Sequence, residues 1–287
     1  MLRGRNLTGP PVFYSQRHWE GHFVSDKTLS GWALILGASS GFGAACSRAL
    51  AAAGMDIVGV HLDSKATLPR AEAVAADVEA AGRRALFFNV NAADDDKRRQ
   101  VLDTVQAEVG ERRVKLLLHS LAFGSLKPLV ADTPSDSLTR AQIEMTLDVM
   151  AHSLVYWTQD LVWRNLLADD ARVYTMTSAG SHRAFATYGA VGAAKAALES
   201  HVRYLALELA PHNVKVNAIQ AGITDTPALR QIPGHEKAMQ VALKRHPFGR
   251  MTVPEDVANA LVALAQPGSA WMTGQVIRVD GGEDILA

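Results

Sequence analysis

A tyrosine and a lysine, Tyr188 and Lys195, stand seven residues apart in a segment whose composition is typical of a helix. Seven residues make about two turns, so both side chains are expected on nearly the same helix face. A free tyrosine titrates near pKa ~10 and is a poor proton donor at neutral pH. A lysine cation a few ångströms away favours the phenolate and lowers that pKa. The pair is therefore a candidate acid that stabilises or protonates an oxyanion.

The spacing alone also fits a core tyrosine beside a surface lysine, so the elements around the pair decide its meaning. Short apolar runs predict strands at residues 32–36, 55–61, 84–90, 114–119, 172–177, 214–219 and 275–279. Helices are predicted between them, the first ending near Ala53, the others at 66–81, 94–109, 135–167, 188–210 and from 252 to before Pro267. This alternation predicts an α/β fold with a single doubly wound, parallel, seven-stranded sheet of the Rossmann type.

The domain organisation that we predict has an N-terminal arm, residues 1–30, followed by one domain, residues 31–287. The arm contains prolines and aromatic residues and two histidines, His18 and His22, but no helical or strand period, so we predict no metal site there. Residues 222–250 are rich in proline and glycine and are interpreted as a mobile flap with short helices. Thr252 and Glu255 fit a capping box that starts the next helix.

Composition excludes several classes of function. Twenty-nine basic residues balance twenty-nine acidic residues, which gives no indication of a nucleic-acid or anionic membrane partner. No segment has the ~20 apolar residues of a membrane span, and the N-terminus lacks the apolar core of a signal peptide. The single cysteine, Cys46, lies in an Ala-rich helical segment and is expected to be a buried apolar residue. We therefore expect a cytoplasmic protein.

A glycine-rich loop lies between the first predicted strand and the first helix. Gly37 permits a tight turn, while Gly41 and Gly43 let the backbone approach a pyrophosphate and let the helix pack on the strand. The helix N-terminus supplies N–H donors and a partial positive charge. A lone glycine cluster also fits an ordinary turn, but its position here favours a dinucleotide site. The candidate binding residues in this loop are Gly37, Ser39, Ser40, Gly41, Phe42 and Gly43.

Three motifs together resemble the short-chain dehydrogenase/reductase family: the glycine loop, the Tyr188–Lys195 pair and the terminal Val279-Asp280-Gly281-Gly282. The resemblance covers residues 30–287, and the motifs come in the family's order. It implies that Lys195 binds the nicotinamide ribose and lowers the pKa of Tyr188. It also implies that Tyr188 stabilises or protonates the substrate oxygen.

Departures from the family pattern are similar to its enoyl-acyl-carrier-protein reductase branch. The segment after the fourth predicted strand reads His119-Ser120-Leu121-Ala122-Phe123, the usual helix asparagine is replaced by Met150, and the usual Pro-Gly is Ala221-Gly222. This branch reduces a carbon–carbon double bond conjugated to a thioester. The resemblance thus implies NAD(P)H-dependent reduction of a 2-enoyl thioester in fatty-acid synthesis. It also implies that His119 contributes its backbone, not a catalytic base.

One position keeps an alternative open. Many reductases of this branch carry a second tyrosine ten residues before the first, and Ser178 stands there. Carbonyl-reducing members use a serine nearby, and Thr177 or Ser178 fits that role. A 3-oxoacyl-acyl-carrier-protein reductase is therefore the first alternative. The second is a dinucleotide-binding protein without catalysis.

Cofactor choice is expected to depend on the end of the second strand, where an acid binds adenosine ribose and repels a 2′-phosphate. Asp63 lies two positions past the usual acid site, which is His61, while Lys65 fits a phosphate. We predict NAD, with NADP as the alternative. The resemblance assigns further cofactor contacts to Asn89, Val90, Ser120, Leu121, Ala122, Ala221, Gly222, Thr224 and Thr226.

The family resemblance also implies partners. The predicted substrate is an acyl thioester, carried on acyl carrier protein or coenzyme A, over which the apolar side chains of the flap would close. Family members are mostly tetramers that use the helices predicted at 135–167 and 188–210, so we predict a homotetramer. Near the C-terminus, Asp280, Glu283 and Asp284 are expected to be solvated acids and not a cation site.

Overall fold

The sheet has the predicted architecture. The computed structural model describes residues 29–285, so the expected arm up to residue 28, with His18 and His22, lies outside the described residues. Seven parallel strands pair in the order β3-β2-β1-β4-β5-β6-β7. The strands are β1 (Trp32–Leu36), β2 (Asp56–His61), β3 (Ala85–Asn89), β4 (Val114–His119), β5 (Leu167–Thr177), β6 (Lys215–Ala221) and β7 (Val276–Val279).

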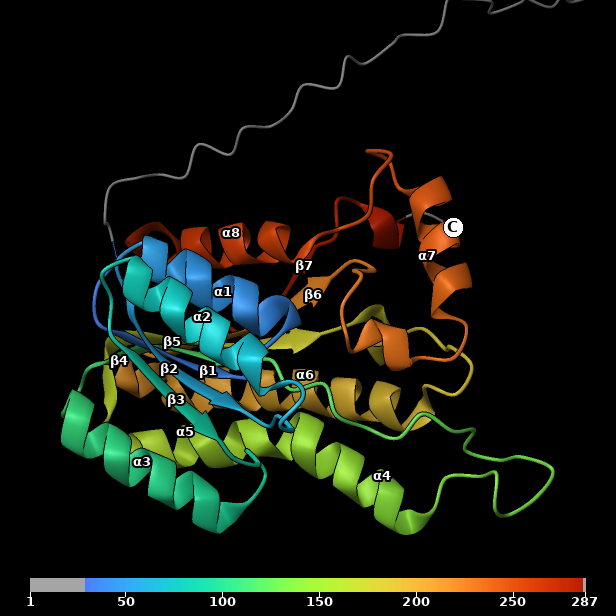
Figure 1. Cartoon of the computed structure of the whole chain (residues 1–287), viewed down its shortest axis with the longest axis horizontal. Helices are drawn as coiled ribbons and strands as arrows, with labels where there is room; N and C mark the ends of the chain where they lie inside the picture. Colours follow the sequence, from blue (N-terminus) through green and yellow to red (C-terminus); the bar gives the residue numbers. More distant parts are fainter. Residues whose placement is uncertain (1–28, 286–287) are drawn as a thin grey trace, which may run out of the picture.

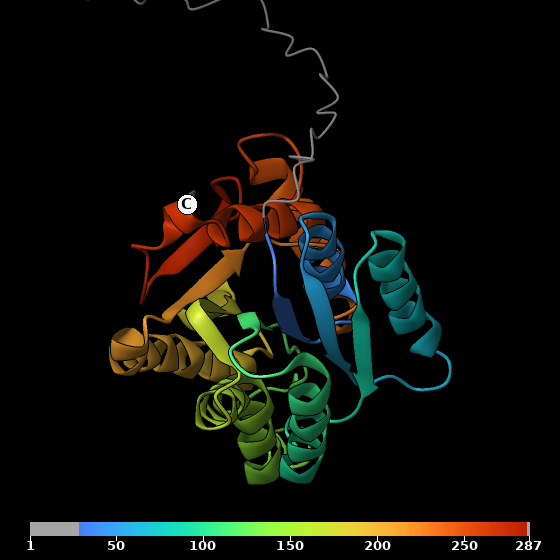
Figure 2. The ribbon, with the colours of Figure 1, turned by 90° about the vertical axis from the view of Figure 1, so that its left-hand side faces the viewer.

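Helices cover both faces of this sheet (Figures 1 and 2). One layer holds α1 (Gly41–Ala52), α2 (Leu68–Ala80) and α8 (Pro254–Leu264), and the other holds α3 (Asp95–Val109), α5 (Ser153–Trp163) and α6 (Gly189–Leu209). Successive side chains of a strand point to opposite faces. In β1, accordingly, Trp32, Leu34 and Leu36 join one buried apolar cluster, while Ala33 and Ile35 join the other. Burial on both faces explains why the strands read as continuous apolar runs.

The strand order reverses between β1 and β4, which are neighbours in the sheet. Strands β2 and β3 extend to one side of β1, and β4 to β7 extend to the other. In open α/β sheets, ligands bind in the crevice at the carboxyl ends of the strands at such a reversal. Every segment predicted to contact cofactor or substrate follows the carboxyl end of a strand or begins the helix after it. The fold therefore brings these segments to one edge of the sheet.

The single helix predicted at 135–167 is wrong. The structure has α4 (Arg140–Leu147), a π-helical turn (Asp148–His152) and then α5. The first helix starts late because Thr139 and Gln142 form a capping box. At the π turn, the Ser153 hydroxyl donates to the Val149 carbonyl over 2.7 Å, and such bonds from serine to the preceding turn bend helices. The end of the predicted helix, Leu167, instead begins β5.

Two other boundaries differ from expectation. Strand β5 begins at Leu167, not at Arg172, because Leu167 pairs with Val114 before an irregularity in the register. Helix α8 is capped at Val253, not at Thr252, because Pro254 occupies the first helical position, where its missing N–H costs no hydrogen bond. The Asp256 carboxylate then accepts from the Val253 N–H over 2.9 Å.

The segment interpreted as a flap contains two short helical pieces, a 3-10 turn (Leu229–Gln231) and α7 (His235–Arg245). In Figure 1 it stands beside the carboxyl ends of the strands, above the start of α6. Between residues 29 and 285, no helix combines the length and the apolar character that crossing a membrane requires.

Candidate active site

Tyr188 and Lys195 are both anchored on the carboxyl end of β5. Lys195 donates from Nζ to the Met176 carbonyl oxygen over 2.6 Å. The Tyr188 hydroxyl lies 3.4 Å from Ser178 Oγ. Met176 and Ser178 are two residues apart, which is about 6.6 Å along an extended chain. The structure therefore brings together three of the predicted catalytic residues at one strand end.

We predicted that Tyr188 lies inside a helix, but the structure places it just before one. It is the N-cap residue of α6, while Lys195 lies within the helix. The ring packs on Gly180, where a Cβ atom would lie 2.5 Å from Tyr188 Cε1. Gly192 is equally tight, since its Cβ would lie 2.7 Å from the Gly180 carbonyl oxygen. These two glycines allow the loop that follows β5 to pass close to the start of α6.

The fourth predicted catalytic residue, Thr177, points elsewhere. Its hydroxyl donates to Glu199 Oε1 over 2.6 Å, and the residue is buried. Because the Thr177 hydroxyl is directed to Glu199 and Ser178 reaches the phenol, the geometry favours Ser178 as the hydroxyl partner of Tyr188. Glu199 follows Lys195 by one helical turn on α6, so it was detectable as an i, i+4 charge pair. Sequence reasoning missed it.

The acid–base properties of the pair follow from burial. The pKa of the Tyr188 phenol is raised, because burial penalises the phenolate and the hydrogen bond from Ser178 only partly opposes this. The sequence led us to expect that Lys195 lowers the pKa of Tyr188. This lowering is not found, and the Lys195 ammonium instead donates to the Met176 carbonyl oxygen. Burial lowers the pKa of Lys195 to about 8, and the nearby Glu199 carboxylate works in the opposite direction.

His119 is fully buried, and both of its ring nitrogens lie within hydrogen-bonding distance of hydroxyl groups, those of Ser153 and Thr175. Burial, with a smaller contribution from the Lys195 charge, lowers the pKa of His119 to about 3. Its Nε2 lies 2.8 Å from Ser153 Oγ, and Ser153 donates to Val149, so the imidazole proton is assigned to Nε2. The histidine is thus a neutral bridge between β4 and the π turn. Its side chain supports the helix that carries Met150.

The glycine loop forms a close-packed cradle. Gly37 and Gly41 adopt positive φ, at 88° and 52°. A Cβ atom at Gly37 would lie 2.4 Å from the Ser120 carbonyl oxygen, and one at Gly43 would lie 2.0 Å from the Gly37 carbonyl oxygen. Helix α1 starts in this loop, and Ser40 occupies its N-cap position without a side-chain cap hydrogen bond. These features fit a dinucleotide pyrophosphate, which would accept from the first N–H groups of α1.

Asp63 is held at the end of β2 by residues from three segments. His61 Nδ1 lies 2.8 Å from Asp63 Oδ2. The Asn89 side chain accepts from the Asp63 N–H and donates to the Asp63 carbonyl, both over 2.9 Å. Burial alone would raise the pKa of the Asp63 carboxyl, but hydrogen bonds from Thr67, Ser39 and His61 keep it below its usual value. Asp63 is thus an oriented carboxylate beside the glycine loop, as ribose binding requires.

The remaining predicted cofactor residues lie around the same strand ends. Thr226, near the start of the flap, packs on Gly41, whose Cβ would lie 3.4 Å from Thr226 Cγ2. The Ser120 N–H donates to the Leu36 carbonyl over 2.9 Å, which fixes the segment after β4 beside the glycine loop. The other predicted residues end or follow β1, β3, β4 and β6 at the same edge: Phe42, Val90, Leu121, Ala122, Ala221, Gly222 and Thr224.

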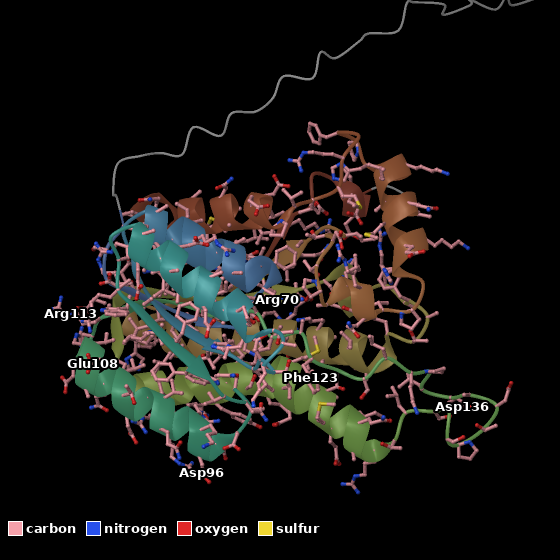
Figure 3. All side chains as sticks on the ribbon, in the orientation of Figure 1. Arg70, Asp96, Glu108, Arg113, Phe123 and Asp136 are labelled. Carbon is pink, nitrogen blue, oxygen red and sulfur yellow. The ribbon has the colours of Figure 1, made fainter. Side chains whose placement is uncertain are left out.

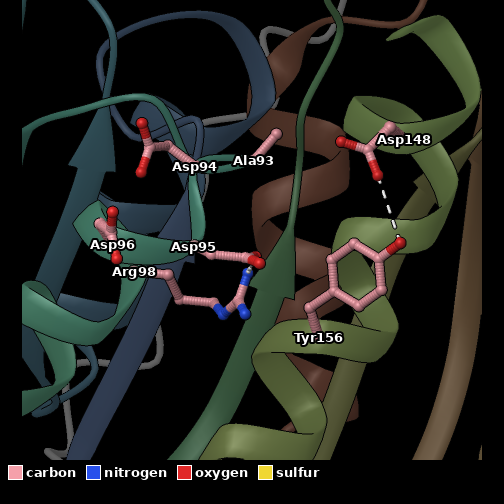
Figure 4. Close-up of a pocket in the computed structure, with 7 residues that line it drawn as sticks. All are labelled: Ala93, Asp94, Asp95, Asp96, Arg98, Asp148 and Tyr156. Carbon is pink, nitrogen blue, oxygen red and sulfur yellow. Dashed lines mark hydrogen bonds and ion pairs between the residues drawn. The ribbon is translucent and has the colours of Figure 1, made fainter. Parts of the chain in front are cut away.

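An open pocket of about 540 Å³ lies away from Tyr188 and Lys195. Figure 4 shows acidic side chains at the start of α3 facing Asp148 and Tyr156 across it. Arg98, the one cation among the described residues that line it, contacts Asp95 at 2.8 Å and Asp160 at 2.7 Å, and the Tyr156 hydroxyl donates to Asp148. None of the predicted catalytic or cofactor residues lines this pocket, so we do not assign the reaction to it.

Comparisons with known proteins agree with this geometry. A family model described as enoyl-(acyl carrier protein) reductase matches residues 37–283. The chain is 33% identical over 201 residues to the NADH-dependent enoyl-acyl-carrier-protein reductase FabI of Nostoc sp., which covers 70% of this chain and 76% of the relative. It is 30% identical over 256 residues to 1-cyclohexenylcarbonyl-CoA reductase of Streptomyces collinus, which covers 88% of this chain and 87% of the relative.

A solved structure has the same architecture. The enoyl-acyl-carrier-protein reductase (NADH) of Aquifex aeolicus superposes with a TM-score of 0.79 at 25% identity, covering 90% of this chain and 98% of that chain. The family match spans the glycine loop, the β5 strand end and the Tyr188–Lys195 pair. The chain therefore belongs to the enoyl-(acyl carrier protein) reductase family of short-chain dehydrogenases/reductases.

Proposed function

We propose that this protein uses NADH to reduce the carbon–carbon double bond of a 2-enoyl thioester. The observation that carries the proposal is the anchoring of Tyr188 and Lys195 on the carboxyl end of β5, at the same edge of the sheet as the glycine loop after β1. The enoyl-acyl-carrier-protein reductases and the cyclohexenylcarbonyl-CoA reductase that the chain resembles support this substrate class. We infer a substrate carried on acyl carrier protein or coenzyme A.

When bound, NADH would supply the hydride for the β-carbon of the thioester, the thioester oxygen would carry the resulting negative charge, and the α-carbon would then take a proton from water. Tyr188 donates a hydrogen bond to that oxygen and stabilises the enolate. Because burial raises its pKa, the phenol stays protonated at neutral pH and is always available as a donor. Lys195 holds the nicotinamide ribose and adds positive charge.

Apolar side chains beside the crevice fit an acyl chain. Phe123 lies on the segment between β4 and α4 and is 64% exposed (Figure 3). Phe185 packs edge-on against Tyr188, with ring centroids 6.2 Å apart, and is half exposed. Phe185 is therefore an exposed aromatic ring next to the candidate donor, and such a ring provides apolar area that a substrate can cover.

One observation favours a second function. The 3.4 Å approach of Ser178 to Tyr188 also provides two hydroxyl groups for a ketone oxygen, as carbonyl reduction needs.

The two functions are separated by supplying NADH with crotonyl-CoA and, in parallel, with acetoacetyl-CoA. We expect NADH oxidation with crotonyl-CoA. Turnover of acetoacetyl-CoA alone would replace the proposal with a carbonyl reductase, and NADH binding without turnover of a broad panel would indicate a non-catalytic dinucleotide-binding protein.

The choice between NADH and NADPH gives a direct test of Asp63. Replacing Asp63 by alanine removes the carboxylate that repels a 2′-phosphate, so we expect the ratio of kcat/KM for NADPH to that for NADH to rise about tenfold or more. Steady-state kinetics with both cofactors measures this ratio. The control is Asp77→Asn, which removes an exposed carboxylate on α2. An unchanged ratio in Asp63→Ala would remove Asp63 from cofactor selection.

The pH dependence of turnover tests the charge on Lys195. The ammonium is present below its pKa of about 8 and is lost above it, so kcat/KM should decline as the pH rises through this value. The Glu199 carboxylate raises that pKa, and Glu199→Gln should therefore move the decline to lower pH. Glutamine still accepts from Thr177. Glu208→Gln, an exposed change on the same helix, is the matched control and should leave the profile in place.

The assembly and location of the protein are part of the proposal. We propose a homotetramer, and three exposed apolar residues on α5 and α6 support it: Trp163, Tyr204 and Leu207. Sedimentation of the purified protein tests the number of subunits. We also infer a cytoplasmic location, since the chain has one cysteine and its proposed reaction uses a reduced nicotinamide.

A further inference from the structure

The sequence suggested that the acids near the C-terminus are solvated, but the structure shows otherwise. We call residues 280–285 the C-terminal turn. It follows β7 and includes a 3-10 helix (Glu283–Ile285). The Asp280 carboxylate accepts from the N–H groups of Gly282 and Asp284, over 2.9 and 3.1 Å. The side chain of Asp284 is only 5% exposed. The turn is thus a closed unit that carries a buried carboxylate.

Asp284 contacts the loop between Ser178 and Tyr188, which we call the tyrosine loop. Its Oδ2 lies 3.1 Å from His182 Nε2, and its Oδ1 lies 3.0 Å from Arg183 Nε. Arg183 also donates from Nη2 to the Asp284 carbonyl oxygen over 2.7 Å. The Asp284 carboxylate therefore holds two consecutive side chains of the loop that separates the two candidate catalytic hydroxyl groups.

The same carboxylate is fixed to the sheet. Gln220, near the end of β6, donates to Asp284 Oδ2 over 3.0 Å, and Arg278 of β7 contacts Oδ2 at 3.1 Å. Burial alone would raise the pKa of Asp284, but hydrogen bonds from Gln220 and His182 and the charge of Arg183 keep it low. Asp284 thus stays ionised and links the rigid strand ends to the tyrosine loop.

The C-terminal turn also contacts both ends of the flap, residues 222–250. Near its beginning, the Ile223 N–H donates to Glu283 Oε2 over 2.8 Å. Towards its end, His246 Nε2 lies 2.9 Å from the Asp280 carbonyl oxygen. In Figure 1 the C-terminal turn, at the red end of the colour scale, lies beside α7. The two attachment points of the flap are therefore held by one short segment.

We propose that the C-terminal turn positions the reaction site, with Asp284 as the positioning residue for the tyrosine loop and Glu283 for the start of the flap. Neither residue touches the Tyr188 hydroxyl or Lys195; each acts through the segment that it holds. A catalytic group displaced by about 1 Å can lose on the order of 100-fold in rate. The kinetic part of this inference rests on the proposed reductase function.

The first test replaces Asp284 by asparagine, which keeps the size of the side chain and removes its charge. We expect kcat/KM with crotonyl-CoA to fall by about 10- to 100-fold, while the Kd for NADH stays within about twofold. We also expect faster amide hydrogen exchange in residues 179–187. Asp96→Asn is the control, because Asp96 is an exposed carboxylate at the far end of the molecule (Figure 3).

The second test compares two changes at Glu283. Glutamine keeps an acceptor for the Ile223 N–H, whereas alanine removes it. We expect Glu283→Gln to resemble the unmodified protein, and Glu283→Ala to show faster hydrogen exchange at residues 223–232 and a raised KM for the thioester. This pair remains informative if Asp284→Asn does not fold, since Glu283 is less central to the ion pairs.

Several results would overturn the inference. Unchanged exchange in residues 179–187 together with unchanged kcat/KM in Asp284→Asn would remove Asp284 from positioning. Unchanged exchange in Glu283→Ala would remove Glu283. Hydrogen exchange needs no substrate, so it tests the turn even if the unmodified protein fails to reduce crotonyl-CoA. In that case the proposed function fails, and the structural role of the turn is decided separately.

Discussion

Replacing Tyr188 by phenylalanine is expected to lower kcat with an enoyl thioester by about 10²- to 10⁴-fold, the range lost with a positioned proton donor. The Kd for NADH should remain within about twofold, because the ring still packs on Gly180 and the glycine loop is untouched. The change deletes one buried hydroxyl and its contact with Ser178. Single-turnover kinetics with NADH and crotonyl-CoA, together with NADH fluorescence titration, measures both quantities.

The control for this substitution is Tyr156→Phe, which removes a tyrosine hydroxyl that donates to Asp148 in the pocket away from the candidate active site. It should leave kcat and the Kd for NADH unchanged. A Tyr188→Phe protein with nearly full kcat would show that the phenol is not the donor to the developing oxyanion. The reaction would then need another hydroxyl, and Ser178 is the nearest candidate.

The sequence was sufficient to predict the sheet because the strands are buried on both faces. In β1, five consecutive apolar residues fill both cores, so the strand appears as an uninterrupted run. The glycine loop was predictable for a similar reason. At Gly37 and Gly43 a Cβ atom would overlap with backbone, and a backbone clash restricts the residue type. The strands of the sheet and the glycine loop were therefore both predictable from short stretches of sequence.

Features that depend on tertiary contacts were not predictable. The π turn within the predicted long helix is stabilised by His119 and Ser153, which are 34 residues apart, and no local period reveals that bond. The direction of the Tyr188 pKa was also missed. Seven-residue spacing suggests proximity of Lys195, but it cannot show that Nζ donates to Met176 while the phenol is desolvated.

The C-terminal acids show the same limit most clearly. Acids near a chain end are usually solvated, and the sequence offers no local reason to expect otherwise. Asp284 is buried because His182 and Arg183, about 100 residues earlier, reach it from the tyrosine loop. Similarly, Asp63 is two positions past the usual acid site, yet His61 at that site orients it. In both cases the partners that fix the carboxylate were not visible in the sequence.

Replacing Lys195 tests the other half of the catalytic pair and should affect both binding and turnover. We expect Lys195→Ala to raise the Kd for NADH about tenfold or more and to lower kcat by at least about 10²-fold, since it removes the proposed ribose contact and the positive charge proposed to lie near the oxyanion. Calorimetric titration of NADH and initial rates with crotonyl-CoA measure the two effects.

Alanine also removes the buried methylene chain of Lys195, so Lys195→Met is needed beside it. Methionine fills a similar volume without the ammonium, and the Met176 carbonyl then loses its donor in both variants. If charge and ribose binding explain the role of Lys195, both variants should lose kcat and NADH affinity to a similar extent. A methionine variant with nearly normal NADH affinity would show that Lys195 supports the site by packing, and its assignment as the cofactor-binding cation would be wrong.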